Sequence, residues 1–308
     1  MIIAITGPTG SGKSALAVEL AKLCNGSIIS CDSVQVYRGF NIGSGKVTEE
    51  EKQGIPHYLL DIRDGNEEFT AGEFVNRAKK AVDEIERLGR VPIIVGGTGL
   101  YYRAFAYQYA FTDGNKEKEK ELRNQYLRLL EEKGVEHLYK MLVAVDEESA
   151  RAINPNHSSR IIRALVFYQS NLDGIVIQKD ETKGLRDDIL GIYLDVEREV
   201  LYDNINKRVD QMVESGLVDE VKDLLESGVR ADAAPMKTIG YKEIVSYLKG
   251  DCKLEEAVAS IKQNSRRYAK RQITWFKKHE ELFRMSYNSF EDREKIICHL
   301  LKYLNKTH

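Results

Sequence analysis

The feature that most constrains this chain is a glycine-rich loop close to its start. Residues 7–14 read GPTGSGKS, which fits the pattern GxxxxGK[ST]. The apolar run MIIAIT precedes the loop, and the stretch SALAVELAKL, with leucines at helical spacing, follows it. Backbone N–H groups of such a loop surround an anion at the N-terminus of the following helix. The sequence therefore predicts a phosphate-binding loop made of Gly7, Pro8, Thr9, Gly10, Ser11, Gly12, Lys13 and Ser14.

The pattern says less about which phosphate the loop binds. Lys13 is expected to neutralise phosphate oxygens, and the Ser14 hydroxyl is expected to ligate Mg²⁺. A kinase or NTPase usually adds an apolar strand that ends in an aspartate organising metal and water. Here the apolar run VPIIV ends in glycines, and Asp61 follows only the short run YLL. The sequence therefore predicts a phosphate ligand without specifying a nucleotide triphosphate.

The rest of the first 107 residues alternates between strands and helices. SIIS and VPIIV are typical of buried strands, and Thr70 with Glu73 predicts a capping box for a helix that ends at Gly89. The later stretch DDILGIYLDVE predicts a strand that rejoins the sheet. The expected fold class is α/β: a P-loop NTPase-like parallel sheet core flanked by helices, with a helical insertion and a helical C-terminal part.

The domain organisation follows from a change in composition after Phe111. The next stretch is highly charged, helical and free of strand signals, so we expect residues 113–185 to form a helical insertion. Residues 1–112 and 186–308 then make up the core with its C-terminal helices. From Arg198 onward the pattern is helical, with stops expected at Gly216, Gly228 and Gly250.

Composition limits where the protein works. The formal net charge of the 308 residues is only −2, so an anionic partner has to be argued from local clusters. The four cysteines form no CxxC pair and no zinc spacing, which favours reduced, packed thiols. No apolar run approaches the roughly 20 residues that a membrane span requires. Because the chain also begins directly with a strand, we expect a cytoplasmic protein without a leader or a membrane association.

Two further side chains follow predicted strands. Asp32 follows SIIS, and Thr98 follows VPIIV and two glycines. Strand carboxyl ends in an open α/β sheet face the ligand crevice, so Asp32 is a candidate general base or metal ligand and Thr98 a candidate ligand contact. A turn-capping aspartate and a tight strand–helix turn explain the two residues equally well on spacing alone.

Positive charge is concentrated in two places. Arg160 and Arg163 lie three residues apart on one face of a predicted helix, which suits phosphate contacts, although solvated surface arginines explain the pattern at least as well. Residues 257–279 carry seven Lys and Arg and no Asp or Glu. Apolar and aromatic residues of this segment, among them Ile261 and Phe276, share one helical face, and the cations gather on another. Such a helix is suited to following a nucleic-acid backbone, whereas solvated helices normally mix both signs of charge.

Seven tracts together resemble the tRNA dimethylallyltransferase (tRNA isopentenyltransferase) family. They are GPTGSGKS, SCDSVQVYRG, VGGTGLYYRA, NPNHSSRIIRAL, YDNINKRVDQMVESGLVDEV, KTIGYKEI and RRYAKRQITWFK. They occur in the order that the family has and cover about residues 5 to 278. The chain has no C-terminal zinc finger, so it resembles the bacterial type.

The resemblance implies transfer of a dimethylallyl group from dimethylallyl diphosphate to N6 of adenosine 37, beside the tRNA anticodon. The phosphate loop would then hold a diphosphate leaving group, with Mg²⁺ at Ser14, and Lys13 and Arg208 would stabilise its charge. Asp32 matches the general base that takes the proton from the amine. The adenine is expected to be flipped out of its stack.

The resemblance also implies a set of tRNA contacts and a monomer that binds the anticodon stem-loop. The implied contacts are Asp32, Ser33, Val34, Gln35, Thr98, Arg123, Ser159, Arg160, Arg163, Lys237, Gly240, Lys242, Arg266, Lys270 and Arg271.

Three other functions remain open at this point. A P-loop small-molecule kinase would use the loop for ATP, although its second metal motif is weak here. An adenylate isopentenyltransferase acting on free nucleotide would leave the insertion and the basic helix without a role. A non-catalytic RNA-binding protein would leave tRNA chemically unchanged.

Overall fold

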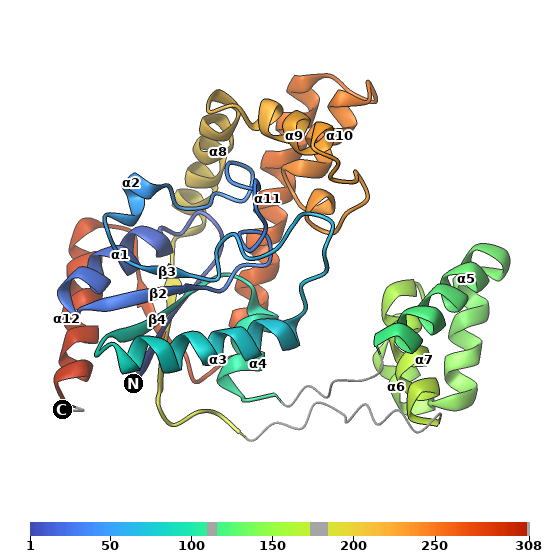
Figure 1. Ribbon diagram of the computed structural model, residues 1–308, viewed down its shortest axis with the longest axis horizontal. Helices are drawn as coiled ribbons and strands as arrows, with labels where there is room; N and C mark the ends of the chain where they lie inside the picture. Colours follow the sequence, from blue (N-terminus) through green and yellow to red (C-terminus); the bar gives the residue numbers. More distant parts are fainter. Residues whose placement is uncertain (110–115, 173–183, 307–308) are drawn as a thin grey trace. The chain divides into compact units, whose positions relative to one another are not determined.

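The computed structural model describes residues 1–109, 116–172 and 184–306, and it divides into two compact units (Figure 1). One unit comprises Met1–Gln108 with Gly184–His308, and the other comprises Tyr109–Lys183. The second unit thus begins four residues before the 113 expected from the sequence and ends two residues before the expected 185. In the described parts of the chain, no helix is long and apolar enough to cross a membrane.

The larger unit is built on a parallel sheet. Its described strands, in the spatial order β3-β2-β4-β1-β5-β6, number six, and each pairs in parallel with its neighbour. They are β1 (Ile2–Thr6), β2 (Gly26–Ser30), β3 (His57–Tyr58), β4 (Val91–Gly96), β5 (Ile189–Asp195) and β6 (Phe283–Ser286). The strands predicted at SIIS, VPIIV and DDILGIYLDVE are β2, β4 and β5, so the expected α/β fold class is confirmed.

Helices cover the sheet. Helices α1 (Lys13–Leu23) and α12 (Phe290–Lys306) share one core with alternate residues of the strands, such as Ile3, Ile93 and Ile192. Helix α3 (Ala71–Arg87) packs against β2 and β4, and against α4 (Gly99–Ala106). Side chains alternate across each strand, so apolar residues on one face of the sheet pack against α1 and α12 and those on the other face pack against α3. Both faces are covered by helices, as expected for a parallel sheet.

The prediction for the start of α3 was half right. Thr70 caps the helix, since its side chain accepts the Glu73 N–H at 3.2 Å. The Glu73 carboxylate pairs instead with Arg63 and Arg77. Two nearby guanidinium groups bind a carboxylate more strongly than one backbone N–H, which explains the difference.

The C-terminal part forms a second layer of helices beside the sheet. They are α8 (Arg198–Glu214), α9 (Leu217–Glu226), the 3₁₀ turn η1 (Pro235–Lys237), α10 (Tyr241–Leu248) and α11 (Leu254–Phe276). The predicted stops are confirmed, because Gly216, Gly228 and Gly250 follow three of these helices with positive φ. The helical reading from Arg198 onward was wrong at β6, whose sequence FRMS alternates over only four residues and is held by pairing with β5.

The regular elements described in the smaller unit are all helices. It contains α5 (Lys116–Val145, with a break at Gly134), α6 (Glu147–Ala152) and α7 (Ser158–Leu172). These helices have their own core, which includes Leu138, Leu142, Ile161 and Leu165. Residues 113–115 and 173–183 of the predicted insertion, and residues 110–112 before it, lie outside the described residues.

Candidate active site

The phosphate loop connects β1 to α1 and depends on its glycines. Gly10 and Gly12 have φ of 79° and 77°, a region that favours glycine. A Cβ at Gly10 would lie 2.8 Å from Ile205 Cγ1, and one at Gly12 would lie 2.9 Å from Tyr287 Cε1. The loop can therefore adopt this conformation only because these positions lack side chains. That geometry confirms the strand–loop–helix arrangement that an anion site needs.

Lys13 lies at the start of α1, and no carboxylate among the described residues is hydrogen-bonded to its amino group. Its Nζ donates to the Pro8 carbonyl at 2.7 Å and to Ser11 Oγ at 3.4 Å. The pKa of Lys13 is lowered to about 7, chiefly by burial and also by the charge of Arg208, against the opposing effect of Asp32. A desolvated ammonium without a counter-charge is stabilised by a bound anion. Next to it, Ser14 is exposed in the first turn of α1.

Arg208 on α8 is the second buried cation. Its Nη2 donates to the Gly45 carbonyl at 3.3 Å. Burial lowers the pKa of Arg208, while the charges of Asp32 and Glu51 raise it. Gly45 has φ of 58°, and a Cβ there would lie 1.4 Å from Arg208 Nη2. The guanidinium therefore occupies the space that a side chain at position 45 would need.

Lys13, Ser14 and Arg208 line one cavity of about 850 Å³. Its apolar side includes Val18, Ile42 and Met212. Because the cavity joins two desolvated cations to an apolar wall, it suits an amphipathic ligand with an anionic end. The sequence placed Lys13 and Arg208 two hundred residues apart, and the fold brings them to the same cavity.

Asp32 lies two residues after β2, at the carboxyl edge of the sheet. Its Oδ1 accepts the N–H groups of Val34 (2.8 Å) and Gln35 (3.2 Å). Its Oδ2 has no hydrogen-bond partner among the described residues. The turn-capping role weighed from the sequence therefore uses one oxygen, and the other oxygen is left for chemistry. Ser33, Val34 and Gln35 form the turn that Asp32 caps, and all are partly exposed.

Thr98 follows β4 and lies beside the end of β2. Its N–H is 3.4 Å from the Cys31 carbonyl. A Cβ at Gly96 would be 2.0 Å from that same carbonyl oxygen, so only glycine permits this approach. Thr98 and Asp32 are thus held next to each other by the backbone, as expected for two strand ends in one crevice.

Gln272 is a buried residue of α11 that the sequence did not single out. Its Oε1 accepts the Thr9 N–H at 2.9 Å, and its Nε2 donates to the Gly97 carbonyl at 2.8 Å. It therefore ties the phosphate loop to the turn before Thr98. One feature of the sequence could have marked it. Gln272 lies on the apolar face of the helix, where a polar side chain needs buried hydrogen-bond partners.

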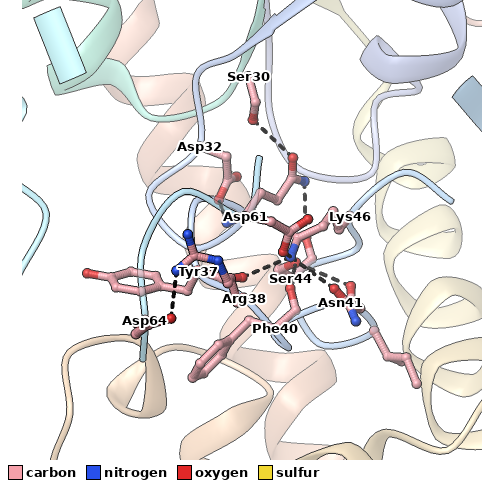
Figure 2. Close-up of polar contacts among 12 residues, drawn as sticks. Ser30, Asp32, Tyr37, Arg38, Phe40, Asn41, Ser44, Lys46, Asp61 and Asp64 are labelled. Atoms are coloured by element: carbon pink, nitrogen blue, oxygen red, sulfur yellow. Dashed lines mark hydrogen bonds and ion pairs between the residues drawn. The ribbon is translucent and has the colours of Figure 1, made fainter. Parts of the chain in front are cut away.

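Asp61, weighed as a possible metal-organising aspartate, is used structurally. Figure 2 shows it facing Lys46, with which it forms an ion pair at 2.6 Å. Lys46 Nζ also donates to the Tyr37 carbonyl and to Asn41 Oδ1, both at 2.9 Å. The nearly buried Lys46 side chain thus joins both ends of the loop at 37–46 to Asp61. These contacts give Asp61 a structural partner in Lys46.

Glu220 on α9 anchors the same loop and was also missed. Its carboxylate accepts the N–H groups of Asn41 (3.0 Å), Ile42 (2.6 Å) and Gly43 (3.1 Å). The Tyr241 hydroxyl donates to it at 2.8 Å, and burial raises the pKa of that phenol. A carboxylate that accepts three consecutive backbone N–H groups fixes the wall of the cavity.

The basic segment is helix α11 continued to His279. Its predicted apolar face is confirmed, since Ile261 and Phe276 are buried and Val258, Tyr268 and Trp275 are half-buried. Two of its cations are bound within the unit: Lys262 pairs with Asp210 at 2.6 Å, and Arg266 donates to Asn206 Oδ1 at 2.6 Å. The exposed cations are Arg267, Lys270, Arg271, Lys277 and Lys278.

The other predicted tRNA contacts lie in two separate places. Near the start of α10, Lys237 and Lys242 are exposed, while Gly240 is buried and donates its N–H to Glu243 at 2.8 Å. In the helical unit, the exposed residues are Arg123 on α5 and Ser159, Arg160 and Arg163 on α7.

The protein side chains described near the phosphate loop offer too few oxygen ligands to hold a divalent cation unless a bound phosphate supplies more. Among the described residues no three His, Cys, Asp or Glu side chains group as a metal cage. The exposed Ser14 hydroxyl beside Lys13 suits Mg²⁺, which binds one or two protein oxygens and completes its shell with water and substrate phosphates.

Comparison with known proteins gives one consistent result. The family model described as IPP transferase matches residues 35–279. The chain is 46% identical to a tRNA dimethylallyltransferase of Thermoanaerobacter sp. (strain X514) over 312 residues, covering 98% of this chain and 97% of the relative. It is 46% identical over 277 residues to the enzyme of that name from Bacillus cytotoxicus, covering 90% of this chain and 87% of the relative.

Two solved structures are similar along most of the chain. The full-length tRNA isopentenylpyrophosphate transferase of Bacillus halodurans has a TM-score of 0.73 and 40% identity, covering 99% of this chain and 97% of that chain. A eukaryotic dimethylallyltransferase acting on tRNA has a TM-score of 0.78 and 30% identity, covering 94% of this chain and 74% of that chain.

Proposed function

Because the chain belongs to the IPP transferase family, we propose that it transfers a dimethylallyl group from dimethylallyl diphosphate to N6 of adenosine 37 in tRNA. The products are N6-(dimethylallyl)adenosine and diphosphate. The observation that carries the proposal is the cavity that the phosphate loop, Lys13 and Arg208 line together, where the charge of Asp32 raises the pKa of both cations.

The phosphate loop, Lys13 and Arg208 bind the diphosphate in this proposal. As the allylic C–O bond breaks, its electron pair leaves with the diphosphate, and negative charge grows on the bridging oxygen. Two cations already desolvated by the fold stabilise that charge without reorganising. Mg²⁺, held by Ser14 and the phosphates, would supply further positive charge to the leaving group.

Asp32 is the proposed general base. The N6 amine of adenine is a weak nucleophile because its lone pair is delocalised into the ring. As N6 forms its bond to the allylic carbon, Oδ2 of Asp32 takes one N6 proton, while Oδ1 stays bonded to the Val34 and Gln35 N–H groups. Holding the amine against the carbon supplies the orientation that the reaction needs.

For the tRNA we propose a flipped adenine that is read by Asp32, Ser33, Val34, Gln35 and Thr98. Support comes from the close approach of the β2 and β4 ends, which gathers these residues in one crevice. The exposed cations of α11, with Lys237 and Lys242, and the exposed Arg123, Ser159, Arg160 and Arg163 of the helical unit are the proposed contacts to the anticodon stem-loop.

We further propose a cytoplasmic monomer, since one chain supplies the phosphate loop, Arg208 and Asp32 to a single site.

Mass spectrometry of the nucleosides from an anticodon stem-loop tests the proposal. Enzyme, dimethylallyl diphosphate and Mg²⁺ should add one dimethylallyl group to a substrate with adenosine 37, and none to a matched stem-loop with guanosine 37. Faster prenylation of free AMP or ATP would support an adenylate isopentenyltransferase instead. Phosphoryl transfer from labelled ATP without prenylation would indicate a kinase, and unchanged stem-loop mass would indicate a binding protein.

A further inference from the structure

A second group of residues reaches the phosphate loop from the C-terminal end of the chain. Strand β6 pairs with β5 as far as Asp195 and Ser286, and the Tyr287 N–H then donates to the Asp195 carbonyl at 3.0 Å. Asn288 Oδ1 accepts the Glu197 N–H at 2.8 Å. Because the carboxyl ends of parallel strands lie at one edge of the sheet, these bonds hold the start of α12 beside the loop that follows β1.

Tyr287 contacts the phosphate loop itself. A Cβ at Gly12 would lie 2.9 Å from Tyr287 Cε1 and 3.4 Å from its hydroxyl. Burial raises the pKa of the Tyr287 phenol, and the charges of Arg293 and Glu19 act on it in opposite directions. The phenol therefore contacts the loop at Gly12 and is close enough to Glu19 and Arg293 to be affected by their charges.

Arg293 borders the cavity that contains Lys13 and Ser14, and a second cavity of about 530 Å³ lined by the same loop. Its Nη2 is paired with Glu19 of α1. Its Nε is buried and has no hydrogen-bond partner among the described residues. A guanidinium carries five donors in a planar fork that matches phosphate oxygens. Beside a phosphate loop, such an arginine has donors that only a further acceptor can satisfy.

We propose that Arg293 is a further ligand of the diphosphate, and that Glu19 holds its guanidinium in place while the phosphate loop is empty. The identity of the anion rests on the proposed function. Arg293 thereby adds a third cation to Lys13 and Arg208, from a helix on which the sequence showed no site residue. The start of α12 is then part of the substrate site as well as a cover for the sheet.

Titration calorimetry with inorganic diphosphate and Mg²⁺ tests this inference without requiring prenyl transfer. Arg293→Gln is expected to weaken binding at least about tenfold, because a charge-assisted hydrogen bond is lost. Lys295→Gln is the matched control, since it removes the same charge from an exposed position two residues further along α12. The control should bind within about twofold of wild type. Equal binding by wild type and Arg293→Gln would overturn the proposal.

A second variant separates binding from folding. Glu19→Gln releases Arg293 from its partner, so it should tighten diphosphate binding, whereas loosening of α12 would weaken binding. In the Arg293→Gln background the same change should have no effect, which a double-mutant cycle measures. Equal tightening in both backgrounds would show that Glu19 acts without Arg293 and would contradict its assigned role.

Transfer kinetics give a third readout. Arg293→Gln should raise the KM for dimethylallyl diphosphate and leave the KM for the anticodon stem-loop unchanged. A rise in the KM for the stem-loop alone would overturn the inference. Wild-type protein that binds diphosphate through Arg293 yet transfers no prenyl group would refute the proposed function and leave the diphosphate site standing.

Discussion

Lys13 and Lys46 line the same cavity, and each has an aspartate nearby, but their environments are opposite. Lys46 is saturated by an ion pair with Asp61 at 2.6 Å and by two further acceptors. Lys13 donates to one carbonyl and one hydroxyl, and Asp32 acts on it only through its charge. Lys46 stabilises the loop at 37–46, whereas Lys13 is, in our proposal, stabilised by the bound diphosphate. Residue type and location alone do not distinguish the two roles.

The largest expected effect comes from Asp32→Asn. The amide oxygen can still accept the Val34 and Gln35 N–H groups, but the side chain can no longer take a proton. Transfer should fall by about 10²- to 10⁴-fold. Single-turnover rates measure this, with tRNA affinity expected near wild type. Asp61→Asn is the matched control and should change the rate only a few-fold; wild-type rates in Asp32→Asn would remove Asp32 as the base.

Lys13→Met should lower transfer by about 10²- to 10³-fold, since it deletes one preorganised cation from the leaving-group site. It should also abolish binding of inorganic diphosphate. The melting temperature should not decrease, because the variant no longer buries a charged group in an empty site. A clear loss of thermal stability would show that Lys13 is a structural lysine like Lys46.

Lys46→Met should give the reverse pattern. Three acceptors lose their donor, so the free energy of unfolding should fall by about 1–3 kcal/mol. Diphosphate binding should weaken far less than in Lys13→Met. Urea unfolding followed by circular dichroism measures the first effect and calorimetry the second. Equal loss of diphosphate binding in Lys13→Met and Lys46→Met would contradict the different roles assigned to the two lysines.

The lowered pKa of Lys13 makes both the stability of the protein and its affinity for diphosphate depend on pH. It is about 7 in the folded protein and 10.5 in the unfolded chain. Between these values the unfolded chain holds a proton that the folded protein has released, so stability rises with pH in that window. Diphosphate affinity should fall above about pH 7, by at most about tenfold per pH unit. Melting curves of wild type and Lys13→Met, measured from pH 6 to 10, should diverge; parallel curves would contradict the assignment.

The smallest effect concerns two arginines of α11. Arg266 is held by Asn206, whereas Arg271 is exposed and lies over the Tyr268 ring. Arg271→Gln should therefore reduce the slope of log affinity against log salt for the stem-loop by about 1. Arg266→Gln should change that slope less. An unchanged slope in Arg271→Gln would count against this helix as a tRNA contact.

The parts of the fold that could be predicted from the sequence depend on short-range patterns. The phosphate loop has its glycines, its lysine and its strand and helix within about twenty residues, and each buried strand is a short apolar run. Strand β6 has no such pattern and exists because β5 offers an edge to pair with.

The site could be predicted only in part for the same reason. Asp32 and Thr98 could be placed, because the ends of parallel strands share an edge. Gln272 contacts Thr9 across 263 positions of sequence, and Glu220 contacts Asn41 across 179. Gln272 lies on the apolar face of a helix, which indicates buried partners, but nothing local identifies Thr9 as a partner or marks Glu220. The different roles of Lys46 and Lys13 likewise became apparent only from the positions of Asp61 and Arg208 in the fold.

Gly45 is a position at which we expect the chain to tolerate no other amino acid. The residue carries no reactive group, yet the space beside its Cα is filled by the Arg208 guanidinium. Any other amino acid there forces that guanidinium out of the cavity. A saturation scan that selects for tRNA modification should therefore reject substitutions at position 45 about as strictly as those at position 208. Such a scan would then rank a glycine without a reactive group among the catalytic residues.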